Sequence, residues 1–107
     1  MEIVDYIDAA GHMPFRKWLY DLQDRLGRTR IIARLTRVAA GNLGDCKPLR
    51  DGVMELKIDH GPGYRVYLSR QGSQMVLLLC ASDKSNQDRA INLAIDYLKD
   101  WKQRGKS

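Results

Sequence analysis

The sequence predicts an α+β domain in which helices pack on an antiparallel sheet, and three patterns support this class. Two N-terminal segments carry apolar side chains at helical spacing. Residues 53–68 alternate polar and apolar side chains as strands do, and an apolar run at 75–81 precedes a third amphipathic segment. The expected order is β-α-α-β-β-β-α, with one optional extra strand at Lys47 to Arg50.

The N-terminal third predicts a strand followed by a helical hairpin. A short strand comes first, and Pro14 suits the first turn of a helix that should end near Gly27. A second helix follows after a very short link, and Gly41 is expected to cap its C-terminal end. The side chains expected on the buried faces are Ile3, Val4 and Tyr6 of the strand, Phe15, Trp18, Leu19 and Leu22 of the first helix, and Ile31, Ile32, Leu35, Val38 and Ala39 of the second.

The segment VMELKIDHGPGYRVYL, residues 53–68, predicts a β-hairpin that turns at residues 61–63. A turn centred on Gly61 places Lys57 opposite Arg65 and Glu55 opposite Tyr67 on the polar face. Like charges directly opposite each other destabilise a sheet. Either an anion such as phosphate binds between the two cations, or the side chains splay apart into solvent.

The C-terminal part predicts a central strand and a last helix. The run from Met75 to Ala81 is apolar on both faces, as in a strand covered by helices. Ser85 is expected to cap the helix, with Asp88 near its positive end. Its buried stripe should comprise Ile91, Ala94, Leu98 and Trp101.

Composition limits the classes of function. A length of 107 residues indicates one domain, spanning residues 1–107. The formal net charge of +5 favours a polyanionic or acidic partner. Two distant cysteines and two isolated histidines indicate neither a disulfide framework nor a metal site. The apolar runs are far shorter than the roughly 18 residues of a membrane helix and no secretory signal is visible, so we expect a cytoplasmic protein without a membrane partner.

A stripe of arginines lies opposite the apolar face of the second predicted helix. Arg30, Arg34 and Arg37 recur at helical spacing. The stripe is either a surface that follows a phosphate backbone or an ordinary solvated helix face.

Nearly the whole chain resembles the RelE/ParE superfamily of type II toxins, and within it the HigB-like addiction module killer proteins. The resemblance rests on four segments in order: FRKWLYDL, RIIARLTRVAAGNLGDCKPL, GVMELKIDHGPGYRVYL and LLLCASDKSNQ. It implies a RelE-like antiparallel sheet with an N-terminal helical hairpin and a C-terminal helix packed on it.

The implied activity is ribosome-dependent cleavage of mRNA without metal or cofactor. In such a reaction the ribose 2′-hydroxyl attacks the adjacent phosphorus, and cations stabilise the charge on the phosphate. By resemblance, the catalytic group is Arg65 as phosphate clamp, Lys57 as stabilising cation or acid, Glu55 as base and Lys84 as a further cation. The residues expected to contact RNA are Tyr67, Arg30, Arg34, Arg37 and Lys47.

The chain departs from the family at the proton-transfer group. Many relatives carry Tyr or His near the last strand, whereas residues 82–94 contain neither, so Tyr67 and His60 are the substitutes. The implied partners are mRNA, the ribosome and a cognate antitoxin, expected to be a helix-turn-helix protein encoded next to the toxin, with operator DNA reached only through that antitoxin. Two alternatives are a ParE-like toxin of DNA gyrase and a non-enzymatic RNA-binding module.

Overall fold

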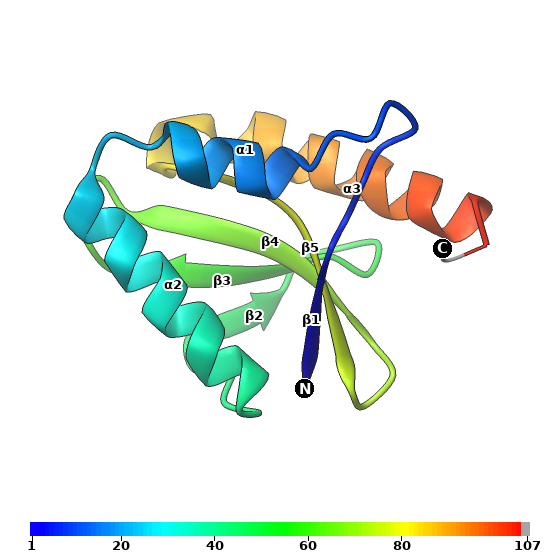
Figure 1. Cartoon of the computed structure of the whole chain (residues 1–107), viewed down its shortest axis with the longest axis horizontal. Helices are drawn as coiled ribbons and strands as arrows, with labels where there is room; N and C mark the ends of the chain where they lie inside the picture. The colour runs from blue at the N-terminus through cyan, green and yellow to red at the C-terminus, as the bar shows by residue number, and fades with distance from the viewer. Residues whose placement is uncertain (106–107) are drawn as a thin grey trace.

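Three helices pack on the two faces of a five-stranded mixed sheet in an α+β fold (Figure 1). The computed structural model describes residues 1–105. The sheet has the order β1-β5-β4-β3-β2. The elements are β1 (Glu2–Asp5), α1 (Pro14–Asp21), α2 (Arg25–Ala39), β2 (Cys46–Pro48), β3 (Met54–Ile58), β4 (Tyr64–Gln71), β5 (Met75–Ser82), the 3₁₀ turn η1 (Lys84–Asn86) and α3 (Gln87–Gln103).

The sheet is antiparallel from β2 to β5, but β1 pairs with β5 in parallel. The prediction of a wholly antiparallel sheet is therefore wrong at this edge. Alternation of side chains identifies a strand but does not say which neighbour it will have. Here α1 and α2 carry the chain from β1 at one edge to β2 at the other, and the later turns return β5 to the side of β1. The optional strand exists and covers Cys46–Pro48.

The first helix ends at Asp21 rather than near Gly27. Asp24 caps α2, because its side chain accepts a hydrogen bond from the backbone N–H of Gly27 at 2.9 Å. Gly27 lies inside α2, where a Cβ would stand 2.6 Å from both Asp24 Oδ2 and Tyr64 Cε2. This glycine therefore permits a close approach of helix and strand and does not end a helix.

Of two other predicted helix ends, one agrees with the structure and one does not. Gly41 follows α2 with a φ of 94°, so the predicted C-terminal cap is confirmed. The last helix begins at Gln87 and not at Ser85. The side chain of Asp83 accepts a hydrogen bond from the Ser85 N–H at 2.9 Å and caps η1, which comes just before α3.

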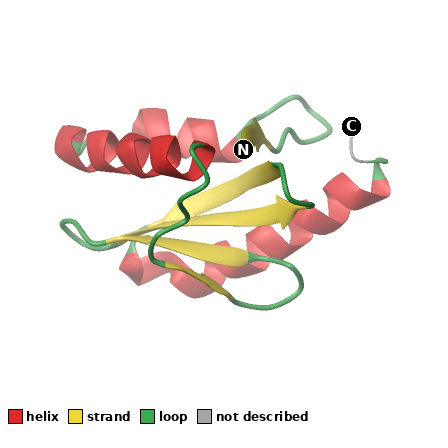
Figure 2. Cartoon of the chain, turned by 90° about the horizontal axis from the view of Figure 1, so that it is seen from below, coloured by secondary structure: helices red, strands yellow, loops and turns green. Residues whose placement is uncertain are grey.

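Helices lie on both sides of the sheet (Figure 2), and the sheet separates two apolar clusters. One lies under α1 and α2, and the other lies under α3. The apolar run of β5 supplies both, since Val76 and Leu78 join the first cluster while Leu77 and Leu79 join the second. The prediction that this strand is buried on both faces is confirmed.

Coverage of the two faces differs. A helix is about 10 Å wide and strands lie about 4.8 Å apart, so one helix covers about two strands. On the first face, α1 packs on β5 and α2 packs on β3. On the second face, α3 packs mainly on β5 and β4. The β2 and β3 positions on the α3 face lie outside the main contacts of this helix, and polar side chains occupy them.

A polar contact fixes the end of α3 to the chain after β1. The Tyr6 hydroxyl donates to Asp100 Oδ2 at 2.5 Å, and the Tyr6 ring stacks on Tyr97 with centroids 4.8 Å apart. Within residues 1–105, no helix combines the length and the hydrophobicity that crossing a membrane requires.

Candidate functional site

Two rows of side chains cross the sheet on the α3 face. Strand register places Lys57, Arg65 and Ser82 side by side in one row. The next row contains Lys47, Glu55, Tyr67 and Cys80. The predicted pairing of Lys57 with Arg65 and of Glu55 with Tyr67 is confirmed, so the two cations do lie on directly opposed strand positions.

Arg65 and Glu55 form a buried pair at the centre of these rows. Their side chains are 8% and 5% exposed, and Arg65 Nε lies 3.9 Å from Glu55 Oε1. Arg65 Nη1 donates to the carbonyl oxygen of Gly63 at 2.7 Å, whereas the buried Nε has no hydrogen-bond partner. The guanidinium is thus held in place from two sides, and Glu55 lies behind it as its counter-charge.

Tyr67 is fully buried, with 0% of its surface exposed. Its hydroxyl lies 3.2 Å from Ser82 Oγ. Burial is the main cause that raises the pKa of the Tyr67 phenol, and the nearby Glu55 carboxylate adds to the increase. Tyr67 is therefore neutral near pH 7, and its ring is not on the surface where a base could stack.

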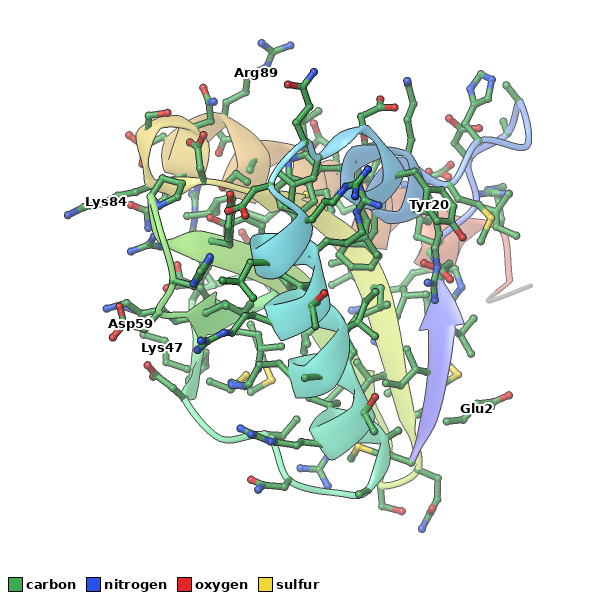
Figure 3. The ribbon with its side chains drawn as sticks, turned by 60° about the vertical axis from the view of Figure 1, so that its left-hand side comes forward. Glu2, Tyr20, Lys47, Asp59, Lys84 and Arg89 are labelled. Carbon is green, nitrogen blue, oxygen red and sulfur yellow. The ribbon has the colours of Figure 1, made fainter. Side chains whose placement is uncertain are left out.

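Exposed lysines surround the buried pair. Lys57 on β3, Lys47 on β2 and Lys84 in η1 are all exposed. Figure 3 shows Lys47 and Lys84 on the same side of the molecule. A Cβ placed on Gly63 would stand 3.0 Å from Arg65 Nη1 and 4.0 Å from the Lys84 Cβ. The turn before β4 therefore brings Arg65 and Lys84 together, although they are distant in sequence.

The α2 arginines line a separate hollow that reaches the same strand. A pocket of about 280 Å³ lies between α2 and the end of β3, and Arg30, Arg34, Arg37 and Lys57 line it. Arg34 is half-buried and donates to the carbonyl oxygens of Leu43 at 3.1 Å and Asp45 at 3.4 Å. Arg34 therefore holds the loop before β2, while Arg30 and Arg37 remain exposed beside Lys57.

His60 belongs to a different cluster, at the start of α2. Its Nε2 lies 3.6 Å from Asp24 Oδ2, and the Tyr64 hydroxyl donates to the same oxygen at 2.7 Å. Hydrogen bonds from the Gly27 N–H and from Tyr64 lower the pKa of Asp24. Burial, with the contact to Asp24, raises the pKa of Tyr64 to about 12. The structure therefore places His60 in a contact that holds the hairpin turn against α2.

Sequence reasoning missed the residues that complete the site. Ser82 enters the first row because β5 carries a register irregularity opposite Tyr67 and Leu68, which local alternation does not reveal. Asp45 and Asp59 join the cations at the α2 pocket. In the described part of the chain, no group of three or more His, Cys, Asp or Glu residues is placed to hold a metal ion.

Comparison with known proteins identifies a relative of this chain. No family model matches this chain. A Haemophilus influenzae protein described as uncharacterized is 46% identical over 88 residues, which cover 82% of this chain and 89% of the relative. The chain belongs to the family of that protein. At this identity and coverage the two chains share their fold.

Proposed function

We propose that the protein is a metal-independent endoribonuclease that cleaves mRNA on the ribosome, as a HigB-like toxin of the RelE/ParE superfamily. The observation that carries the proposal is the group of three cations at one end of the α3 face. Arg65 is held by Gly63 and Glu55, and the exposed Lys57 and Lys84 lie on either side of it. Forked and point-like cations in one place suit a phosphate whose charge increases during reaction.

The proposed chemistry assigns roles to Lys57, Lys84 and Glu55. The 2′-hydroxyl of a ribose gives up its proton to solvent water as its oxygen forms a bond to the adjacent phosphorus, the bond from phosphorus to the 5′-oxygen breaks, and a 2′,3′-cyclic phosphate and a 5′-hydroxyl result. Lys57 stabilises the phosphate and supplies a proton to the leaving 5′-oxygen, and Lys84 adds a second exposed cation. Since Glu55 is buried behind Arg65, we give it the role of holding the guanidinium in place.

The proposed partners, RNA and an antitoxin, both bind the same positively charged surface. RNA bound to the lysines continues along Arg30 and Arg37, which line the pocket that Lys57 also lines. An antitoxin of complementary charge that covers this surface blocks it. We place the protein in the cytoplasm, where mRNA and the ribosome are, with operator DNA contacted only through the antitoxin.

The test is controlled expression of Lys57→Ala beside the wild-type chain. We expect the wild-type protein to arrest growth and to leave mRNA fragments with cyclic phosphate ends. Lys57→Ala should lower the cleavage rate at least about 100-fold, because one charge-stabilising contact is worth about that much. Cleavage sites are mapped by primer extension after a short pulse of expression.

Lys99→Ala is the matched control, since Lys99 is exposed on α3 and no feature of the site includes it. It should keep full toxicity. Intact transcripts and normal growth with the wild-type chain would contradict the proposal. A DNA-damage response that precedes any fall in translation would indicate a gyrase target instead.

A second candidate function is a non-enzymatic RNA-binding module. It is favoured because groups that could act as the base are buried or held by another side chain. Glu55 and Tyr67 are buried, and His60 is engaged by Asp24. In this reading the exposed Arg30, Arg37 and Lys57 bind RNA without cutting it. RNA that stays intact with the purified protein and with ribosomes, but binds with a steep salt dependence, would decide for this candidate.

A further inference from the structure

A further pocket lies apart from the cation group. It has a volume of about 530 Å³ and lies between the loop after β2 and the first turns of α3. This size is within the range of about 300–1,000 Å³ that is usual for small-molecule sites. Its lining residues are Leu49, Arg50, Asp88, Ile91 and Asn92.

The pocket lies on the same face as the proposed reaction site. Leu49 follows Lys47 by two residues and packs with the cluster under α3, so both belong to the α3 face. Asp88 follows Lys84 by one helical turn. The pocket therefore lies along the same α3 face as Lys47, Glu55 and Lys84.

The lining combines aliphatic side chains with polar groups. Leu49 and Ile91 are half-buried aliphatic side chains from opposite sides of the pocket. Arg50 Nη2 donates to Asn92 Oδ1 at 2.8 Å, and this bond joins the loop after β2 to α3. The Asn92 oxygen accepts this bond, and the Asn92 amide NH₂ and the remaining Arg50 N–H groups are donors. Asp88, which has no hydrogen-bond or ion-pair partner within residues 1–105, offers only acceptors.

We infer that this pocket binds a guanine base, an inference that rests on the proposed RNA substrate. Aliphatic walls fit a planar ring. Guanine presents two adjacent N–H donors on one edge, which a carboxylate accepts together, and acceptors O6 and N7 on another, which suit an arginine fork. Adenine has one donor group, and its ring nitrogens would face the acceptor oxygens of Asp88. The pocket thus selects one base of an RNA strand bound along this face.

The test measures binding of 5′-GMP and 5′-AMP to the full chain by calorimetry, with amide chemical shifts to locate the base. Both nucleotides carry the same phosphate, so their ratio reports on the base alone. We expect GMP to bind about tenfold more tightly, since a good bidentate contact discriminates by about that factor. Shifts should include Asp88 and Ile91.

Two variants address the polar contacts. Asp88→Asn should remove most of the preference for GMP, because an amide no longer accepts two donors. Arg50→Lys keeps the charge and should lower the preference, since it removes the planar fork. Asp96→Asn, an exposed position on the same helix, is the matched control and should retain the wild-type ratio.

The outcomes separate this inference from the proposed function. Equal binding of the two nucleotides by the wild-type chain, or an unchanged ratio in Asp88→Asn, would overturn the guanine pocket. Lys57→Ala should weaken both nucleotides by the same factor and leave their ratio unchanged. If a chain without RNA-cleaving activity still shows the Asp88-dependent ratio, the base pocket stands and only the nuclease proposal fails.

Discussion

The two faces of the sheet differ in what their buried side chains do. Under α1 and α2, strand residues such as Leu56, Val66 and Leu78 form a continuous apolar cluster. On the α3 face, the side chains of β3 and β4 at the corresponding places are Glu55 and Arg65, which are almost as well buried but carry charge. Both faces stabilise the fold by burying apolar side chains, but only the second also holds a buried guanidinium and its counter-charge.

The difference follows from helix number. Two helices cover about four strands, and one helix covers about two. The α3 face therefore has room beside β2 and β3 for charged groups and for a pocket. A charge on the first face would instead have to displace packed aliphatic side chains and pay the full cost of desolvation.

The largest expected effect comes from separating the buried pair. Arg65→Ala leaves the Glu55 carboxylate buried without its cation, so we expect the free energy of unfolding to fall by about 3–5 kcal/mol. The double variant Glu55→Met/Arg65→Met should recover most of that loss while remaining inactive. Urea unfolding measures both.

Lys57→Ala, on the exposed neighbour of Arg65, is the stability control and should stay within about 0.5 kcal/mol of wild type. An Arg65→Ala protein as stable as wild type would mean that the guanidinium lies in water, and the contrast between the faces would be lost.

A smaller effect is expected on the first face at Gly27. Gly27→Ala adds a methyl group 2.6 Å from Asp24 Oδ2 and Tyr64 Cε2, so the helix must move away from β4. We expect a loss of about 1–3 kcal/mol in spite of the better helix propensity of alanine. Thr29→Ala, at an exposed position of α2, is the control in the same thermal unfolding experiment. A stabilised Gly27→Ala would show that the contact is loose.

The smallest effect concerns two carboxylates that anchor the helices. The pKa of Asp24 is lowered by the Gly27 N–H and Tyr64, and that of Asp100 is lowered by Tyr6 and Arg104. Because each folded-state pKa is lowered, the stabilisation is complete above the unfolded value of about 3.9 and is lost as pH falls through the folded value.

Asp24→Asn and Asp100→Asn should each flatten the acid side of the stability profile, and their effects should add because the sites lie at different ends of the fold. Thermal unfolding from about pH 6 down to about pH 2 measures the profile. If either variant keeps the wild-type dependence of stability on pH, the carboxylate that it replaces has an ordinary pKa in the folded wild-type chain.

Much of the fold could be predicted because it depends on neighbours in sequence. The Lys57–Arg65 register follows from a short turn, and the double burial of β5 follows from an uninterrupted apolar run. Helix ends were less predictable. A glycine such as Gly27 commonly marks the end of a helix. Its actual role depends on the Tyr64 ring, which approaches it from another element.

The sequence by itself determined which residues share a face, since strand alternation and helical spacing are local properties of the chain. It also determined the excess of positive charge. Only the tertiary structure decided that Glu55 and Tyr67 are buried, that Lys84 meets Arg65 at Gly63, and that a pocket forms between the loop after β2 and α3. Those facts depend on where α3 crosses the sheet, and that position is set by packing between residues far apart in sequence.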